Sequence, residues 1–480
     1  MVTADLETET QKVVSALTTI YSISQHSHNN NNNNNNNSQA NNRDQANQYL
    51  TQYQRNAIAW EISDRLLSSP CTNTTTHHDM DIMIQTQIYF FAAQTIHTKV
   101  RSDMIQLPTH SYHSLKQSLL NHLVKFCHSV VSGATIGNMH VGGSYFRPTV
   151  SRLAMALCAL SVQIQWYDVI DQLLLHSSSD TTTIGTDASL MSSSSSSATT
   201  TTSLEFTIPN PTNISLILEM AQMLPEEATS YRLLVQDRNI RQGFIQGLIE
   251  KSKVMFQFFH AIIVHYETHC DNSGGGSGSN SGNVTSSITK QSTLHVKEQI
   301  LKCILAWVRY INVPATILQE TPILNWVFSI LHSHNYDINH HEYEDSTTSD
   351  MFELAVDVII EILRCYPSDN ELHVGLVQKM IPLVMALAQP QQQQAINTTT
   401  AVAANSTTTP FQKALQNNDE DGMRAFCRIF TEMGESYMSL IMHHEDLNQV
   451  ALVELVLSCS ALPDHGKKGS YCHISFRPTI

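Results

Sequence analysis

The sequence has no long apolar run and little positive charge. No segment of its 480 residues approaches the roughly 18 uninterrupted apolar residues of a membrane-spanning helix, and the amino terminus lacks the basic stretch and apolar run of a signal peptide. Lys and Arg total 27 against 42 Asp and Glu, which gives a formal net charge of -15. This balance disfavours nucleic acid or anionic membrane as the main partner and favours basic protein segments, although acidity also aids solubility.

Motifs that serve common catalytic chemistries are also missing. There is no Gly-x-Ser-x-Gly elbow, no phosphate-binding loop ending in Gly-Lys-Ser/Thr and no dinucleotide fingerprint. The 24 histidines show neither the paired Cys spacings of a zinc ribbon nor a His-Glu-x-x-His helix. We therefore expect a protein that is not an enzyme and that holds no metal or other cofactor.

The cysteines are scattered, odd in number and mostly set within apolar helical runs. Such a pattern predicts reduced core residues rather than a disulfide framework. The positions are Cys71, Cys127, Cys158, Cys270, Cys303, Cys365, Cys427, Cys459 and Cys472.

Four low-complexity tracts interrupt the chain. Their polar composition cannot bury enough apolar surface to order them, so they are predicted to be disordered loop insertions. They are an Asn-rich insert at 29–42, a Ser/Thr-rich tract at 177–203, a Gly/Ser/Asn-rich tract at 271–287 and a Gln/Thr/Ala-rich tract at 389–409.

Between these tracts, apolar residues recur at three- and four-residue steps, with almost no strand-like alternation. The stripe within 80–102 ends before Leu107-Pro108, and a second stripe begins at Leu115, which predicts a helical hairpin. Two stripes follow within 147–176, one through Leu153, Leu157 and Leu160 and a second that opens at Trp166. Further helices are expected over 211–224, 234–267, 293–312, 316–333, 348–366, 369–389, 418–443 and 445–461.

Amphipathic helix pairs in series, each too small to bury its own apolar face, are typical of repeat proteins. We therefore predict an all-α fold, a right-handed α-solenoid of HEAT- or armadillo-like antiparallel helix pairs with disordered low-complexity loop insertions. The expected divisions are repeats over 1–127, an irregular glycine-containing insert at 128–146, further repeats over 147–461 and an atypical tail at 462–480.

Five stretches in fixed order resemble the transportin-SR (transportin 3) and importin-13 group of the importin-β superfamily. The resemblance covers nearly all of the chain outside the tracts, although 128–146 resembles nothing in the group. Members of the group continue beyond the position of Leu462, so this chain is expected to be the N-terminal half of such a protein, through truncation or an altered gene model. The five stretches are WEISDRLL at 60–67, YFFAAQT at 89–95, LPTHSYHSLKQSLL at 107–120, LEMAQMLPEE at 218–227 and CRIFTEMGE at 427–435.

The resemblance implies a nuclear transport receptor that carries protein cargo into the nucleus. The same resemblance implies control by the small GTPase Ran in its GTP form, and Arg/Ser-rich splicing factors as the cargo class. It also implies contacts with Phe-Gly nucleoporins and shuttling between cytoplasm and nucleus, without direct nucleic-acid binding or membrane insertion. Ran contacts are expected in the second helices of the first three repeats, predicted within 44–69, 109–127 and 165–176. The exposed candidates there are Arg55, Asp64, Arg65, Lys116, Asn121 and Lys125.

Other interpretations stay open at this point. A static HEAT-repeat scaffold accommodates the composition and the periodicity equally well. An exporter or bidirectional carrier would couple Ran and cargo with the opposite sign, which the sequence does not fix. The tryptophans, Trp60, Trp166, Trp307 and Trp326, are expected in the core rather than in cargo pockets.

Overall fold

The computed structural model describes residues 2–26, 36–69, 78–132, 135–136, 139–140, 143–176, 210–235, 238–271, 283–333, 346–388, 408–437, 440 and 455. The chain divides into two compact units, Met1–Gly247 (unit 1) and Leu248–Ile480 (unit 2). Each unit is built almost entirely of α-helices. None of the described helices is long and apolar enough to cross a membrane.

Unit 1 contains a series of helices and one short two-stranded hairpin. The helices are α1 (Val2–His26), α2 (Asn36–Arg55), α3 (Ala59–Ser68), α4 (His78–Ser102), α5 (Tyr112–Ser132), α6 (Arg147–Gln163), α7 (Val169–His176), α8 (Pro211–Thr229) and the start of α9 (Arg238–Asp271), with 3-10 turns η1 (Met104–Gln106), η2 (Thr109–Ser111) and η3 (Gly143–Phe146). Strands β1 (Thr135–Ile136) and β2 (Met139–His140) pair antiparallel, with Thr135 opposite His140.

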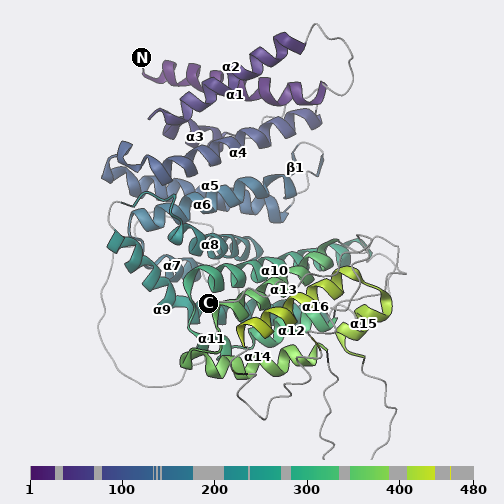
Figure 1. Ribbon diagram of the computed structural model, residues 1–480. Helices are drawn as coiled ribbons and strands as arrows, with labels where there is room; N and C mark the ends of the chain where they lie inside the picture. Colours follow the sequence, from purple (N-terminus) through teal and green to yellow (C-terminus); the bar gives the residue numbers. More distant parts are fainter. Residues whose placement is uncertain are drawn as a thin grey trace, which may run out of the picture. The chain divides into compact units, whose positions relative to one another are not determined.

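Successive helices of unit 1 stack on one another (Figure 1). α1 packs on α2, α3 on α4 and α5 on α6, while α4, α6 and α8 form a continuous row in which α6 contacts both neighbours. Because α6 is enclosed by α4, α5 and α8, nearly its whole circumference is apolar, and every residue from Ala156 to Val162 is buried. The row is therefore the core of unit 1.

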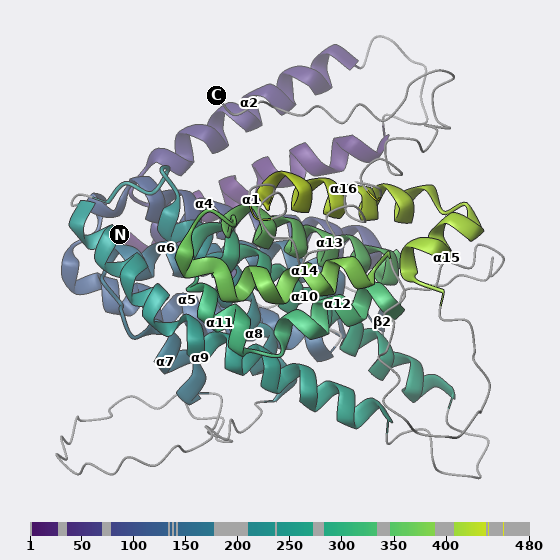
Figure 2. The ribbon, with the colours of Figure 1, turned by 60° about the horizontal axis from the view of Figure 1, so that its bottom comes forward.

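Unit 2 repeats this arrangement with other helices. It contains the rest of α9, then α10 (Asn283–Ile311), α11 (Ala315–Glu320), α12 (Ile323–Ser333), α13 (Ser346–Cys365), η5 (Glu371–His373), α14 (Val374–Ala386), α15 (Pro410–Asn417) and α16 (Glu420–Ser436). α13 lies between α10 and α16, as Figure 2 shows, and also packs on α12. Phe411 of α15 meets the ring of Phe430 on α16 edge to face, with centroids 5.5 Å apart, which closes the core at this end.

Local sequence explains where several helices end. Asn312 and Asn418 adopt the left-handed conformation, with φ of 50° and 52°, just after α10 and α15. Asparagine tolerates this conformation better than other non-glycine residues because its side chain hydrogen-bonds locally. Gln165, with φ of 58°, separates α6 from α7. The two stripes predicted within 147–176, the second of which opens at Trp166, correspond to these two helices.

The prediction of an all-α, HEAT-like solenoid is confirmed, and its handedness stays a prediction. The hairpin predicted from 80–102 and the stripe at Leu115 corresponds to α4 and α5, which are joined by the turn through η1, Leu107-Pro108 and η2. The Tyr89 ring of α4 meets the Phe126 ring of α5 edge to face, with centroids 5.0 Å apart. In addition, α4 packs along α3 and α6, and α5 along α6 and α8.

Several predicted inserts also carry regular structure at their edges. α2 begins at Asn36, within 29–42, and α10 begins at Asn283, within 271–287. The insert predicted at 128–146 holds the end of α5, the β1–β2 hairpin and η3. The tract 177–203, most of 389–409, the tail 462–480 and the helix predicted over 445–461, apart from Leu455, lie outside the described residues.

Candidate Ran-binding surface

The six candidate residues lie on three neighbouring helices of unit 1. Arg55 ends α2, Asp64 and Arg65 belong to α3, and the other three belong to α5. α3 packs against both α2 and α5, so the structure brings the candidates onto adjacent elements. We call these six residues the α2–α3–α5 surface. The segments 44–69 and 109–127, expected to hold second helices of repeats, contain α3 and α5, and the place of each helix within a repeat stays a prediction.

Asp64 joins α3 to α5. Its Oδ1 accepts hydrogen bonds from the Ser118 hydroxyl and from His122 Nε2, the latter at 2.9 Å. Ser118 and His122 are four residues apart and therefore share one face of α5. The hydrogen bond from His122 lowers the pKa of Asp64, and that from Ser118 adds to this, although burial acts in the opposite direction. Asp64 is thus occupied by contacts inside the protein.

Lys125 closes the C-terminal end of α3. Its Nζ donates to the backbone carbonyl of Leu67 at 2.8 Å and lies 5.3 Å from the centre of the Phe126 ring. The last carbonyls of a helix lack intrahelical partners and carry partial negative charge, so an ammonium there is favourable. Lys125 is nevertheless exposed, so its outer edge is accessible.

Lys116 connects α5 to the start of α7. Its Nζ lies 3.4 Å from the centre of the Trp166 ring and donates to Gln172 Oε1 at 3.3 Å. Burial lowers the pKa of Lys116, and the Asp168 carboxylate partly opposes this shift. A cation that stacks on a buried indole and reaches the next helix has a packing role first.

The other three candidates are better placed to meet a partner. Arg55 and Asn121 are exposed, and Asn121 accepts a hydrogen bond from the neighbouring Gln117 at 3.1 Å. Arg65 is also exposed and pairs with Glu7 of α1, whose side chain is itself 58% exposed. Such exposed pairs add little to stability and exchange readily for a competing carboxylate. Arg55, Arg65 and Asn121 are therefore the exposed candidates for which no packing role like that of Lys125 is seen among the described residues.

The tryptophans are core residues, as predicted. Trp307 is fully buried, and Trp60, Trp166 and Trp326 are each 7% exposed. Three of the cysteines predicted for the core, Cys127, Cys158 and Cys303, are buried. Among the described residues, no group of three or more His, Cys, Asp or Glu side chains could hold a metal ion.

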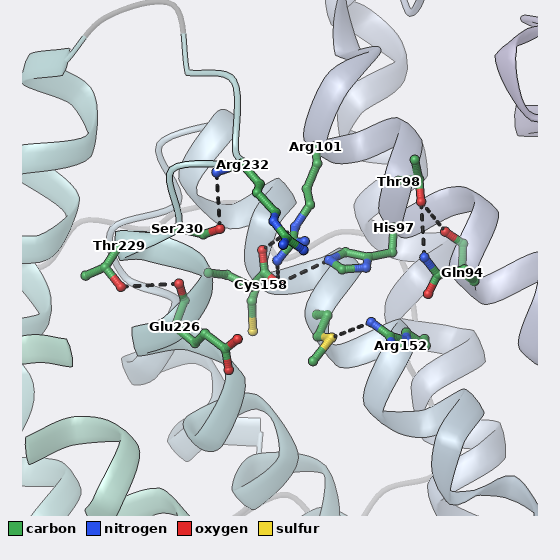
Figure 3. Close-up of polar contacts among 12 residues, drawn as sticks. Gln94, His97, Thr98, Arg101, Arg152, Cys158, Glu226, Thr229, Ser230 and Arg232 are labelled. Carbon is green, nitrogen blue, oxygen red and sulfur yellow. Dashed lines mark hydrogen bonds and ion pairs between the residues drawn. The ribbon is translucent and has the colours of Figure 1, made fainter. Parts of the chain in front are cut away.

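A buried charge cluster escaped the sequence analysis. Glu227, the last residue of the LPEE stretch, contacts His97 and Arg101 of α4, and Figure 3 shows both α4 side chains facing the end of α8. The sequence offered one signal, because a carboxylate within the apolar pattern of a helix needs a partner if it is buried. It did not identify that partner, which lies 126 to 130 residues away.

Comparison with known proteins finds similarity to exportin- and transportin-like proteins. The Exportin 1-like protein family model matches residues 147–359, and the Transportin-3/Importin-13 second TPR domain matches 418–466. The chain is 23% identical over 429 residues to Transportin MOS14 of Arabidopsis thaliana and 23% over 424 residues to the mRNA transport regulator MTR10 of Saccharomyces cerevisiae. These alignments cover 88% and 87% of this chain but 32% of each relative, so the chain spans about a third of their length.

Proposed function

Because the chain belongs to the importin-β superfamily, in its transportin-like group, we propose that it acts as a nuclear transport receptor. It binds protein cargo in the cytoplasm, crosses the pore through contacts with Phe-Gly nucleoporins and releases the cargo when Ran binds in its GTP form. Proteins with Arg/Ser-rich segments are the proposed cargo class. The chain shuttles between cytoplasm and nucleus and performs no catalysis.

One observation carries this proposal over a static scaffold. The fold alone suits either function, since stacked helix pairs serve both carriers and scaffolds. The alignment to two proteins named for transport extends over 88% and 87% of the chain, across both units. A net charge of -15 also suits a carrier of basic segments.

Ran control requires differential binding. Ran-GTP must favour an arrangement of the repeats that cargo disfavours, and the coupling must act equally in both directions. We place the Ran contact on the α2–α3–α5 surface, with Arg55, Arg65 and Asn121 meeting the GTPase directly. Asp64, Lys116 and Lys125 hold the helices that present them.

A pull-down with purified Ran tests this placement. The double variant Arg55→Glu, Arg65→Glu reverses two exposed charges without touching the core, so its helical circular dichroism should equal that of the unchanged chain. Recovery of Ran-GTP should fall by about tenfold or more, in line with the cost of reversing charges at an interface.

The matched control is Arg424→Glu on α16, which also breaks an exposed pair, with Asp421. It should leave Ran-GTP recovery unchanged. Undiminished recovery by the double variant would remove Ran from the α2–α3–α5 surface. No recovery of Ran by the unchanged chain in either nucleotide state would instead favour the scaffold.

A second candidate function is nuclear export. The Exportin 1-like match over 147–359 favours it, because an exporter binds cargo together with Ran-GTP. The two directions differ in the sign of the coupling. Ran-GTP should weaken cargo binding by an importer and strengthen it for an exporter, which a cargo titration with and without Ran-GTP distinguishes.

A further inference from the structure

Glu227 lies at the end of α8, and its side chain is only 1% exposed. Its carboxylate accepts a hydrogen bond from His97 Nε2 at 3.1 Å and another from Arg101 Nε at 2.9 Å, and it makes a further ion pair with the Arg101 guanidinium. His97 and Arg101 are four residues apart on α4 and so share one face of that helix. The His97 side chain is 2% exposed, which makes this a buried cluster rather than a surface pair.

The contact skips a helix of the row. In a stacked repeat protein, each repeat normally touches only its immediate neighbours. α6 lies between α4 and α8 and packs on both, yet Glu227 reaches past it to α4. In Figure 3, His97 and Arg101 lie on one side of Cys158 of α6, and Glu226 and Thr229 of α8 lie on the other.

The segment that follows α8 reinforces this contact. The Leu234 backbone N–H donates to the Arg101 carbonyl at 3.0 Å, and Gln163 of α6 donates to the Leu234 carbonyl at 2.9 Å. Arg241 of α9 donates to the Leu233 carbonyl. Residues 230–235 therefore cross the C-terminal ends of α4 and α6 and are held at three points.

The energetics of burial favour a single arrangement of the three helices. Removing Glu227 from water is costly, and only the two cationic or hydrogen-bonding partners on α4 offset that cost. Any tilt of α8 relative to α4 would leave a buried carboxylate without partners, which is strongly unfavourable. A purely apolar contact would tolerate such sliding far better.

We propose that Glu227, His97 and Arg101, with the segment 230–235, form a latch that locks α4, α6 and α8 into one rigid block. Within this block the repeats open together rather than one at a time. The proposal concerns the fold of unit 1 and holds whatever the chain binds. Any change of curvature on ligand binding must then occur outside the row from α4 to α8.

Hydrogen exchange measured by mass spectrometry on the full chain tests the latch. Glu227→Gln keeps the size of the side chain but removes its charge. Amide exchange should accelerate by at least about tenfold in both 97–103 and 224–235. The factor should be the same in both segments, because they exchange through opening of the same block, whose stability the substitution lowers. The matched control is Glu226→Gln, which alters the exposed neighbouring carboxylate and should change neither segment.

Acceleration confined to 224–235, with 97–103 unchanged, would overturn the proposal, and so would equal effects of the two variants. If Glu227→Gln loses its helical circular dichroism, the same exchange measurement on Arg101→Lys tests the proposal instead. It keeps the charge but loses the two-point contact with the carboxylate. A smaller common acceleration in both segments is expected, and an effect in only one of them would reject the latch.

Discussion

Individual side chains of the α2–α3–α5 surface differ in what they contribute to the fold itself. Lys125 donates a hydrogen bond to the end of α3, whereas Arg55, in the part of the chain that the structure describes, takes part through its backbone carbonyl, which accepts a hydrogen bond from Gln106. Substitutions of Lys125 and Arg55 should therefore lower the free energy of unfolding by different amounts, although both residues are exposed cations.

Lys125→Met keeps the aliphatic stem but removes the donor to Leu67 O. The free energy of unfolding should fall by about 1–2 kcal/mol, the typical cost of losing a charged hydrogen bond at a helix end. Arg55→Met is the matched control and should change it by less than about 0.5 kcal/mol. Urea denaturation followed by circular dichroism measures both, and equal effects would show that Lys125 does not stabilise α3.

Glu298 of α10 offers a pH test in unit 2. The hydrogen bond from His295 chiefly lowers its pKa from 4.5 to about 2, Lys302 adds to the shift, and burial opposes it. Because the folded-state pKa is depressed, the stabilisation is fully present above pH 4.5 and is lost as the pH falls towards 2. The unchanged chain should exceed Glu298→Gln in unfolding free energy near neutral pH, and this difference should shrink between those values. A difference independent of pH across that window would contradict the ion-pair account.

At the scale of elements, the sequence predicted helices well and their partners less well. The stripe over 80–102 corresponds to α4, and the stripe over 293–312 to the apolar part of α10, because a period of 3.6 is a local property of the chain. The packing of α4 along α3 and α6 was not predicted, because it depends on surfaces of helices outside the hairpin. The short helix α15 was missed, since its eight residues follow a low-complexity tract directly.

Helix ends provide an element-scale prediction. Asn312 is exposed, adopts φ of 50° and ends α10 before α11 begins. Asn312→Ala should destabilise unit 2 by about 1 kcal/mol, because alanine is strained in the left-handed conformation. Asn312→Gly should stay within a few tenths of a kcal/mol, since glycine adopts it without strain. Urea denaturation of both variants is the measurement, and equal losses would show that the backbone conformation is not the cause.

In the α2–α3–α5 surface as well, local properties could be predicted from the sequence, whereas contacts between distant residues could not. Exposed polar positions on amphipathic helices were predictable, and Arg55, Arg65, Asn121 and Lys125 are indeed exposed. The roles of Asp64 and Lys116 were not, because Asp64 meets His122 58 residues away and Lys116 meets Gln172 56 residues away. Such contacts depend on which helices become neighbours, which no short motif specifies.

At the scale of the whole molecule, the chain spans about a third of each relative to which it aligns. The resemblance implies Ran contacts in early repeats, and we expect cargo contacts largely in later ones. We therefore expect this chain to bind Ran-GTP yet to hold Arg/Ser-rich peptides weakly, mainly through its net charge of -15.

Peptide titrations at low and high salt test this expectation. Screening weakens long-range attraction but leaves a shaped contact largely intact, so peptide binding should disappear at about 0.5 M salt. Tight, salt-resistant and Ran-GTP-sensitive binding by these 480 residues would show that they already contain the complete cargo site.

The most direct test of the transport account is the affinity of the purified chain for Ran in its two nucleotide states, measured by isothermal titration calorimetry. A receptor under Ran control must distinguish the two states, and a coupling of 1–3 kcal/mol is typical, so the dissociation constant for Ran-GTP should be lower than that for Ran-GDP by about tenfold or more. Equal affinity for both states, or binding to neither, would contradict the account and leave these helix repeats as a scaffold.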